Sequence, residues 1–191
     1  MKKKEPSTNQ PSTVLIGIGT NKGNRKKNLN NALDLLSKNK KIKIIQISKM
    51  LKNPPQEGIK SGYFLNGAIK VETSLTPIQL LKVCKEIEKK LGRRTRGLQA
   101  NRTTGLQDYG TTGKQDYRTT GPQDYRQISP RQYFSRTIDL NILFYGNKIV
   151  DTKTLTIPHP KIEKRYFVLI PLLELEKKLI HPVLKKDLIS L

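Results

Sequence analysis

The sequence predicts an α+β domain, in which strands and helices mix without the strict alternation that is typical of a doubly wound parallel sheet. Several short segments have the two-residue period of strands, and two longer segments have the helical period. Two of the expected strands, 42–47 and 64–72, follow one another with no helix-like segment between them. With 191 residues, the chain is long enough for one domain with a substantial core.

The first elements are a polar tail, a short strand and a helix. Residues 1–12 contain Pro and Ser among polar residues, so we expect a disordered tail before a single domain over 13–191. An apolar strand is predicted at 14–18, ending in the run Gly17-Ile-Gly-Thr-Asn21. Apolar residues then recur at helical spacing over 25–38, which predicts a helix.

The middle of the chain predicts two strands and a second helix. Residues 42–47 alternate Ile and Lys, as a half-exposed strand does, and 64–72 form another strand. Asn53-Pro-Pro55 between them requires an extended or turned backbone. The helix opens at Thr76-Pro77, with proline in its first turn. Its apolar stripe, which assigns the single cysteine to the core, comprises Ile78, Leu80, Leu81, Cys84, Ile87 and Leu91.

The strand predicted at 138–145 carries polar side chains at alternating positions. Asp139 and Asn141 are two residues apart, so both point to one face, while Ile138, Leu140 and Ile142 point to the other. Burying a carboxylate is costly unless a cation binds it. Magnesium accompanying a nucleotide is the expected occupant, because it prefers a few oxygen ligands plus phosphate and water. The alternative is an edge strand with a solvated face.

An internal repeat occupies residues 94–133, as five units of eight residues. Gln-Asp-Tyr and Thr-Thr-Gly recur within the units, and few side chains are apolar. Such a composition buries too little apolar surface to fold alone, so we expect a long flexible octapeptide-repeat insertion at the surface. A recognition array or a stacked β-solenoid remains an alternative.

The chain is strongly basic, with 37 Lys and Arg against 15 Asp and Glu and a formal net charge of +22. The lysines are spread along the chain, which favours a solvated surface that attracts a small anionic substrate such as ATP. A nucleic-acid-binding protein is the less favoured alternative, and its affinity would fall steeply with salt. A single cysteine, no long apolar run and no secretory signal predict a cytoplasmic protein without membrane contact.

Six motifs in one order resemble the 6-hydroxymethyl-7,8-dihydropterin pyrophosphokinase family of folate biosynthesis. The resemblance covers roughly 13–93 and 132–182. The motifs are Gly17-Ile-Gly-Thr-Asn21, Asn53-Pro-Pro55 with Phe64-Leu-Asn66, Ile87-Glu88 with Leu91-Gly-Arg93, Arg136-Thr-Ile-Asp-Leu-Asn141, Ile157-Pro-His-Pro160 and Arg165-Tyr-Phe167. It implies a ferredoxin-like fold with a central antiparallel sheet flanked by helices. It also implies transfer of pyrophosphate from ATP to the hydroxymethyl group of the pterin, with release of AMP.

The resemblance also implies the ligands and the residues that bind them. The partners are ATP and 6-hydroxymethyl-7,8-dihydropterin with Mg²⁺, two ions being expected, and the protein is expected to be a monomer or weak dimer. The catalytic residues would be Arg93, Arg136 and Asp139, and the metal ligands Asp139 and Asn141. ATP would be bound by Glu88, Arg93, Arg136, Thr156, His159 and Arg165. The pterin would be bound by Asn53, Pro54, Phe64, Asn66 and Phe167.

Two departures from the family pattern raise an alternative function. The pattern has a second aspartate where this chain has Asn141, and an amide oxygen brings no charge to a metal. The repeats of 94–133 also lie where the family has a mobile loop that closes over the nucleotide. A degenerate homologue that binds nucleotide or pterin without turnover is therefore the second hypothesis.

Overall fold

The computed structural model describes residues 10–54, 62–92 and 136–190, which belong to one compact unit. Residues 1–9 of the predicted tail and the whole predicted insertion at 94–133 lie outside the described residues. Their predicted conformations, and the division of the chain that they imply, therefore stay predictions.

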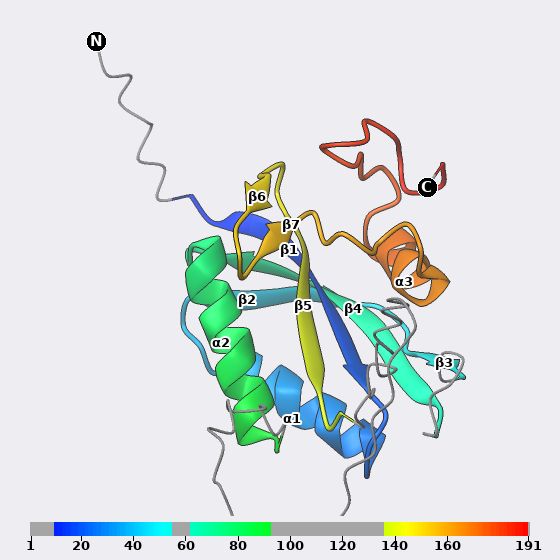
Figure 1. The fold of residues 1–191 in the computed structure, drawn as a ribbon. Coiled ribbons are helices and arrows are strands. Elements are labelled where there is room, and N and C mark those ends of the chain that lie inside the picture. The colour runs from blue at the N-terminus through cyan, green and yellow to red at the C-terminus, as the bar shows by residue number, and fades with distance from the viewer. Residues whose placement is uncertain (1–9, 55–61, 93–135, 191) are drawn as a thin grey trace, which may run out of the picture. The chain divides into compact units, whose positions relative to one another are not determined.

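An antiparallel sheet forms the centre of the fold (Figure 1), with β3 paired to β4 beside the order β2-β4-β1-β5. Its strands are β1 (Ser12–Thr20), β2 (Ile42–Ile47), β3 (Leu51–Asn53), β4 (Phe64–Thr73) and β5 (Asp139–Tyr145). A separate hairpin pairs β6 (Val150–Asp151) with β7 (Thr156–Ile157). In the sheet, β1 lies between β4 and β5, so the beginnings of β4 and β5 meet the end of β1.

In the part of the chain that the structure describes, three helices accompany the sheet: α1 (Arg25–Ser37), α2 (Pro77–Lys90) and α3 (Tyr166–Leu175). Asn24 caps α1 by accepting the N–H of Lys27 at 3.0 Å. Thr76 and Gln79 form a reciprocal capping box at the start of α2, where Pro77 occupies the first turn. None of the helices in the described ranges is long and apolar enough to cross a membrane.

The two faces of the sheet bury different clusters. On one face, Val14, Ile16 and Ile18 of β1 belong to the cluster that contains the apolar stripes of α1 and α2. On the other face, Leu15 belongs to a cluster with Leu172 and Leu175 of α3. This division follows from the alternation of side chains along a strand.

The predicted strands and helices are confirmed, and the structure adds elements that the sequence did not indicate. Cys84 is fully buried, as its place in the stripe of α2 predicted. The apolar segment 166–175 is α3, and β3, β6 and β7 were not predicted. β1 begins at Ser12, the last residue of the predicted tail, because Ser12 pairs with Thr73 of β4.

Candidate active site

A row of three residues crosses the middle of the sheet where β1 ends. Gly19 of β1 lies opposite Asn66 of β4 on one side and opposite Asp139 of β5 on the other. Directly opposed residues of antiparallel strands project to the same face. The Asn66 amide and the Asp139 carboxylate therefore share a face, separated only by a residue without a side chain.

Gly19 provides the space in which the Asn66 side chain lies. A Cβ at Gly19 would overlap Oδ1 of Asn66, which is part of a side-chain amide held in place by a further bond. That bond runs from Nδ2 of Asn66 to Oδ1 of Asn53 at 2.6 Å. The requirement for glycine here is therefore a matter of close approach, not of backbone conformation.

Asp139 projects from the apolar strand β5 with its side chain 20% exposed. Nη1 of Arg136 lies 2.7 Å from its Oδ2, and Nδ2 of Asn141 donates to the same oxygen at 3.1 Å. Its neighbours Ile138 and Leu140 are buried in the cluster on the opposite face. The alternation predicted from the sequence is thus confirmed, with the carboxylate on the face away from α1 and α2.

A bulge in β5 binds the backbone of His159. Ile142 and Phe144 pair with consecutive residues of β1, so Leu143 is the extra residue, and its carbonyl accepts the His159 N–H at 3.0 Å. Burial lowers the pKa of His159 below 6.5, and the charge of Arg165 acts in the same direction.

The hydrogen bonds of His159 indicate its tautomer. Nδ1 lies 3.3 Å from the backbone N–H of Lys161, which donates to it. A neutral ring that accepts at Nδ1 carries its proton on Nε2. The negative charge of Asp139 acts in the opposite direction and raises the pKa of His159. The charges of both Arg165 and Asp139 therefore act on His159.

The residues expected to bind the pterin lie on β3, β4 and α3, except Pro54, which directly follows β3. Asn53 is buried and pairs in register with Phe64, and its Nδ2 donates to the carbonyl of Pro54 at 3.1 Å. Phe167 lies in the first turn of α3, edge-on to Tyr166 and 5.7 Å from the guanidinium of Arg165. α3 packs against β4 and β3, so both expected aromatic residues belong to neighbouring elements.

The remaining residues expected to bind ATP are Glu88, Thr156 and Arg93. Glu88 is buried, with Oε1 accepting the N–H of Leu140 at 2.8 Å and Oε2 lying 3.0 Å from Nζ of Lys85. Protein atoms therefore contact both of its carboxylate oxygens. Thr156 lies in the small hairpin, where its hydroxyl is 3.5 Å from Oδ1 of Asp151. Arg93 lies outside the described residues.

Asn21, which was not among the residues expected to bind a ligand, contacts the backbone of Arg136. Its Oδ1 accepts the N–H of Arg136 at 2.6 Å, and its own N–H donates to the Arg136 carbonyl at 3.1 Å. The only available signal was its position at the end of the Gly17-Ile-Gly-Thr-Asn21 run, which does not distinguish a ligand-binding loop from a turn.

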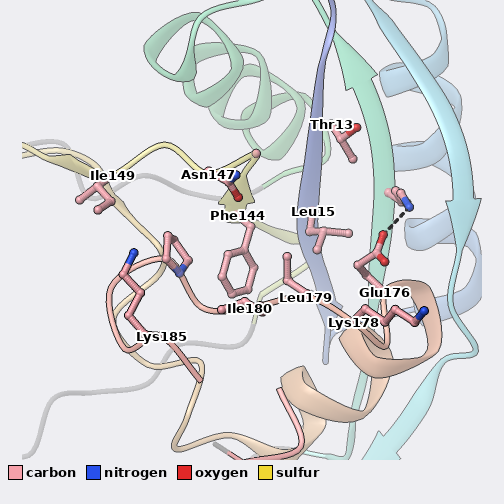
Figure 2. A pocket seen from close by; sticks show the side chains of 13 residues that line it. Thr13, Leu15, Phe144, Asn147, Ile149, Glu176, Lys178, Leu179, Ile180 and Lys185 are labelled. Carbon is pink, nitrogen blue, oxygen red and sulfur yellow. Dashed lines mark hydrogen bonds and ion pairs between the residues drawn. The ribbon is translucent and has the colours of Figure 1, made fainter. Parts of the chain in front are cut away.

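A cavity of about 650 Å³ lies elsewhere (Figure 2), between the far ends of β1 and β5 and the segment that follows α3. Thr13 and Phe144 line it, and they lie toward the opposite ends of their strands from Gly19 and Asp139. Glu176, at its wall, is held by Nζ of Lys70 at 2.7 Å. This cavity therefore does not contain the polar row of the candidate site.

Comparison with known proteins identifies one family. The sequence model of the family 7,8-dihydro-6-hydroxymethylpterin-pyrophosphokinase (HPPK) matches residues 15–106 and 118–177 of this chain. The 2-amino-4-hydroxy-6-hydroxymethyldihydropteridine pyrophosphokinase of Aquifex aeolicus is 32% identical over 93% of this chain and 88% of its own length. The Bacillus subtilis protein of the same name is 30% identical over 84% of this chain and 75% of its own length.

Longer proteins also match. Folic acid synthesis protein fol1 of Pneumocystis carinii is 34% identical over 89% of this chain, which spans 18% of that protein. The crystal structure of Plasmodium falciparum HPPK-DHPS A437G with STZ-DHP has a TM-score of 0.61 and 13% identity, covering 97% of this chain and 45% of that one. At that identity the structural likeness concerns the fold.

Proposed function

The chain belongs to the 7,8-dihydro-6-hydroxymethylpterin-pyrophosphokinase family, and we propose that the row from Asn66 to Asp139 is the centre of its active site. The protein is an ATP-dependent pyrophosphokinase, which transfers pyrophosphate from ATP to 6-hydroxymethyl-7,8-dihydropterin in folate biosynthesis. One observation supports the proposed centre above the others. Across Gly19, an amide suited to a heterocycle faces a carboxylate that is already paired with Arg136.

The fold suits a ferredoxin-like classification. The elements β1, α1, β2, β4, α2 and β5 follow one another as β-α-β-β-α-β, with β3 as an addition beside β4. This arrangement brings the end of β1 between the beginnings of β4 and β5. The residues proposed to bind the pterin and those proposed to bind phosphate then lie on different strands but close to the same point, the end of β1.

The pterin would bind at the β3–β4 side of the row. A flat heterocycle needs hydrogen bonds along its edge and apolar contact on its faces. The bond between Asn66 and Asn53 fixes the orientation of both amides, so their remaining donors and acceptors are presented in a defined direction. Phe64 and Phe167 would supply the apolar contact, with the backbone at Pro54 completing the edge.

The triphosphate would bind at the β5 side. Arg136 and Arg165 carry planar guanidinium groups that can bind two phosphate oxygens each. The Nε2–H of neutral His159 would donate to a further oxygen. Arg93 and Thr156 are retained as proposed ATP-binding residues from the resemblance, while Glu88 is assigned a supporting position because protein atoms contact both of its oxygens.

The donor set suits magnesium that arrives with the nucleotide. Within the described ranges, no group of three or more His, Cys, Asp or Glu side chains could form a metal site by itself. Mg²⁺ is commonly held by one or two carboxylates together with phosphate oxygens and water. Asp139 and the Oδ1 of Asn141 would be its protein ligands. When bound, the ion would neutralise charge on the phosphates.

The reaction requires the pterin hydroxymethyl oxygen to attack the β-phosphorus of ATP. The bond from that phosphorus to the oxygen of the α-phosphate breaks, so AMP leaves and the hydroxyl proton is released. Such transfers depend on positioning and on stabilisation of negative charge. Asn66 and Asn53 would hold the acceptor in line, while Arg136, Arg165 and His159 would hold the phosphates.

Release of AMP tests this proposal. Purified protein incubated with ATP, Mg²⁺ and the pterin should release AMP in a one-to-one ratio with the pyrophosphorylated pterin. Asp139→Ala should lose this activity while retaining its fold. Wild-type activity in Asp139→Ala would contradict the proposed centre, and pterin-dependent binding without AMP release would favour the homologue that lacks turnover.

A further inference from the structure

Two buried side chains hold the backbone on either side of Asp139. Asn21 is 4% exposed and contacts Arg136, three residues before Asp139, while Glu88 is 1% exposed and contacts Leu140, the residue after it. We propose that Asn21 and Glu88 are positioning residues for pyrophosphoryl transfer, which fix the segment 136–140 so that Asp139 is oriented before substrate binds. This inference rests on the role proposed above for Asp139.

Asn21 secures the start of the segment. The last pair in the β1–β5 register is Gly19 with Asp139, so Arg136 lies beyond the ladder. There, Oδ1 of Asn21 accepts the Arg136 N–H at 2.6 Å, and the Asn21 N–H donates to the Arg136 carbonyl at 3.1 Å. One residue thus satisfies both backbone groups of Arg136, whose side chain in turn contacts Asp139.

The Nδ2 of Asn21 is the one buried side-chain N or O atom in the described ranges that has no hydrogen-bond partner. Leaving a buried donor unpaired costs about 1–3 kcal/mol. The side chain is nevertheless held in this orientation, because Oδ1 is already committed to Arg136. The orientation therefore follows from the contact with the segment that carries Asp139.

Glu88 secures the other end of the segment. Among the described strands of the sheet, β5 pairs only with β1, so none of them lies along its outer edge. The last turn of α2 lies beside that edge (Figure 1). The Leu140 N–H donates to Oε1 of Glu88 at 2.8 Å. Successive N–H groups of a strand point to opposite sides, so the neighbouring N–H of Asp139 points toward β1. Glu88 takes the place of a missing strand at this position.

The two contacts constrain the same short piece of backbone. Between them, Ile138 is fully buried, so the segment cannot rotate without removing that side chain from the core. Losing a residue that orients a metal ligand typically lowers metal affinity or activity by about 10-fold to 100-fold. The effect should appear in metal binding as well as in turnover.

A different role for Glu88 makes an opposing prediction. If its negative charge acted directly on the nucleotide or metal, Gln would be as harmful as an apolar residue. If it acts as an acceptor for Leu140, Glu88→Gln retains the acceptor and Glu88→Met removes it at similar size. Glu86 lies two residues away on the exposed surface of α2, so Glu86→Met is the matched control.

The experiment measures Mn²⁺ binding by electron paramagnetic resonance, in the presence of α,β-methylene ATP, for wild type and each variant. Glu88→Met should bind Mn²⁺ about 10-fold more weakly, whereas Glu88→Gln and Glu86→Met should stay within about 2-fold of wild type. Asn21→Leu should weaken Mn²⁺ binding in the same direction as Glu88→Met. In turnover, kcat should fall more than the KM for the pterin rises.

Amide hydrogen exchange provides a second readout that does not need activity. The Leu140 amide should exchange faster in Glu88→Met than in Glu88→Gln, and the Arg136 amide should exchange faster in Asn21→Leu. Wild-type Mn²⁺ affinity in Glu88→Met with faster Leu140 exchange would overturn the proposal, as would equal impairment by Gln and Met. Failure of the proposed function would look different, because wild type and Asp139→Asn would then bind Mn²⁺ equally.

Discussion

Individual residues carry most of the function in this fold, and they differ in how far the sequence revealed them. Asp139 was predictable because a carboxylate at an alternating position of an apolar strand must face away from the core. Asn53 and Asn66 were assigned through the resemblance. The bond between them joins residues on two different strands, so no local sequence pattern indicates it. Glu88 was assigned to ATP through the resemblance, and its spacing on a helix does not reveal that it also contacts the backbone of β5.

Gly19→Ala tests the close approach at the centre of the row. The added Cβ would displace the Asn66 side chain and break its bond to Asn53. We expect pterin affinity to fall by about 10-fold or more, equivalent to about 1.4 kcal/mol. Calorimetric titration with the pterin measures this. Gly17→Ala is the matched control, because the atoms nearest to its Cβ belong to the Leu143 side chain, at 3.3 Å, and not to Asn66.

Asn141→Asp tests whether charge limits metal binding. Nδ2 of Asn141 now donates to Asp139, and aspartate would replace that donor with a second negative charge. Without metal, the two carboxylates should repel each other and lower the melting temperature. With nucleotide, the Mg²⁺ concentration for half-maximal activity should fall and turnover should rise. If both quantities stay unchanged, charge is not what limits this site.

The neutral form of His159 should be favoured at neutral pH. Burial and Arg165 lower its pKa below 6.5, so its stabilising contribution is complete above pH 6.5 and is lost as the pH falls through the lowered value. NMR titration of the ring protons measures this pKa. Arg165→Leu should raise it toward 6.5, and Asp139→Asn should lower it further. Opposite shifts would contradict the shared environment of these three residues.

At the scale of elements, local signals predicted α2 and left β3, β6 and β7 unrecognised. Proline and threonine at a helix start have a defined function, so Thr76-Pro77 indicated the first turn of α2. Strands of two or three residues have too few positions to show a period. The bulge at Leu143 was equally invisible, because its cause is the pairing of β5 with β1.

Thr76→Ala tests the contribution of the capping box at the element scale. It removes the acceptor for the Gln79 N–H, at 3.3 Å, and should destabilise the protein by about 1 kcal/mol. Thermal unfolding should show a decrease of about 2–4 °C for a chain of this size. Thr76→Ser retains the hydroxyl and should restore most of the loss. Metal binding should not change, because Thr76 lies at the opposite end of α2 from Glu88.

At the scale of the whole molecule, one face of the sheet is packed as core, and the other carries the polar row proposed as the active site. The face toward α1 and α2 is continuous core, and its periodicity was readable from the sequence. The opposite face is covered by α3 around Leu15, while the row at Gly19 is polar. Which residues meet along that row depends on the order β4-β1-β5, which no local pattern specifies. The family resemblance implied a central antiparallel sheet but did not give the order of its strands.

The net charge of +22 fits an anionic substrate but does not locate its site. In this account, the position of the nucleotide depends on the carboxylate of Asp139. Calorimetric titration of α,β-methylene ATP into wild type and Asp139→Asn, each with and without Mg²⁺, isolates its role. Mg²⁺ should tighten nucleotide binding by wild type and have little effect on Asp139→Asn. If Mg²⁺ tightens binding equally in both proteins, Asp139 is not the anchor for the metal and its nucleotide.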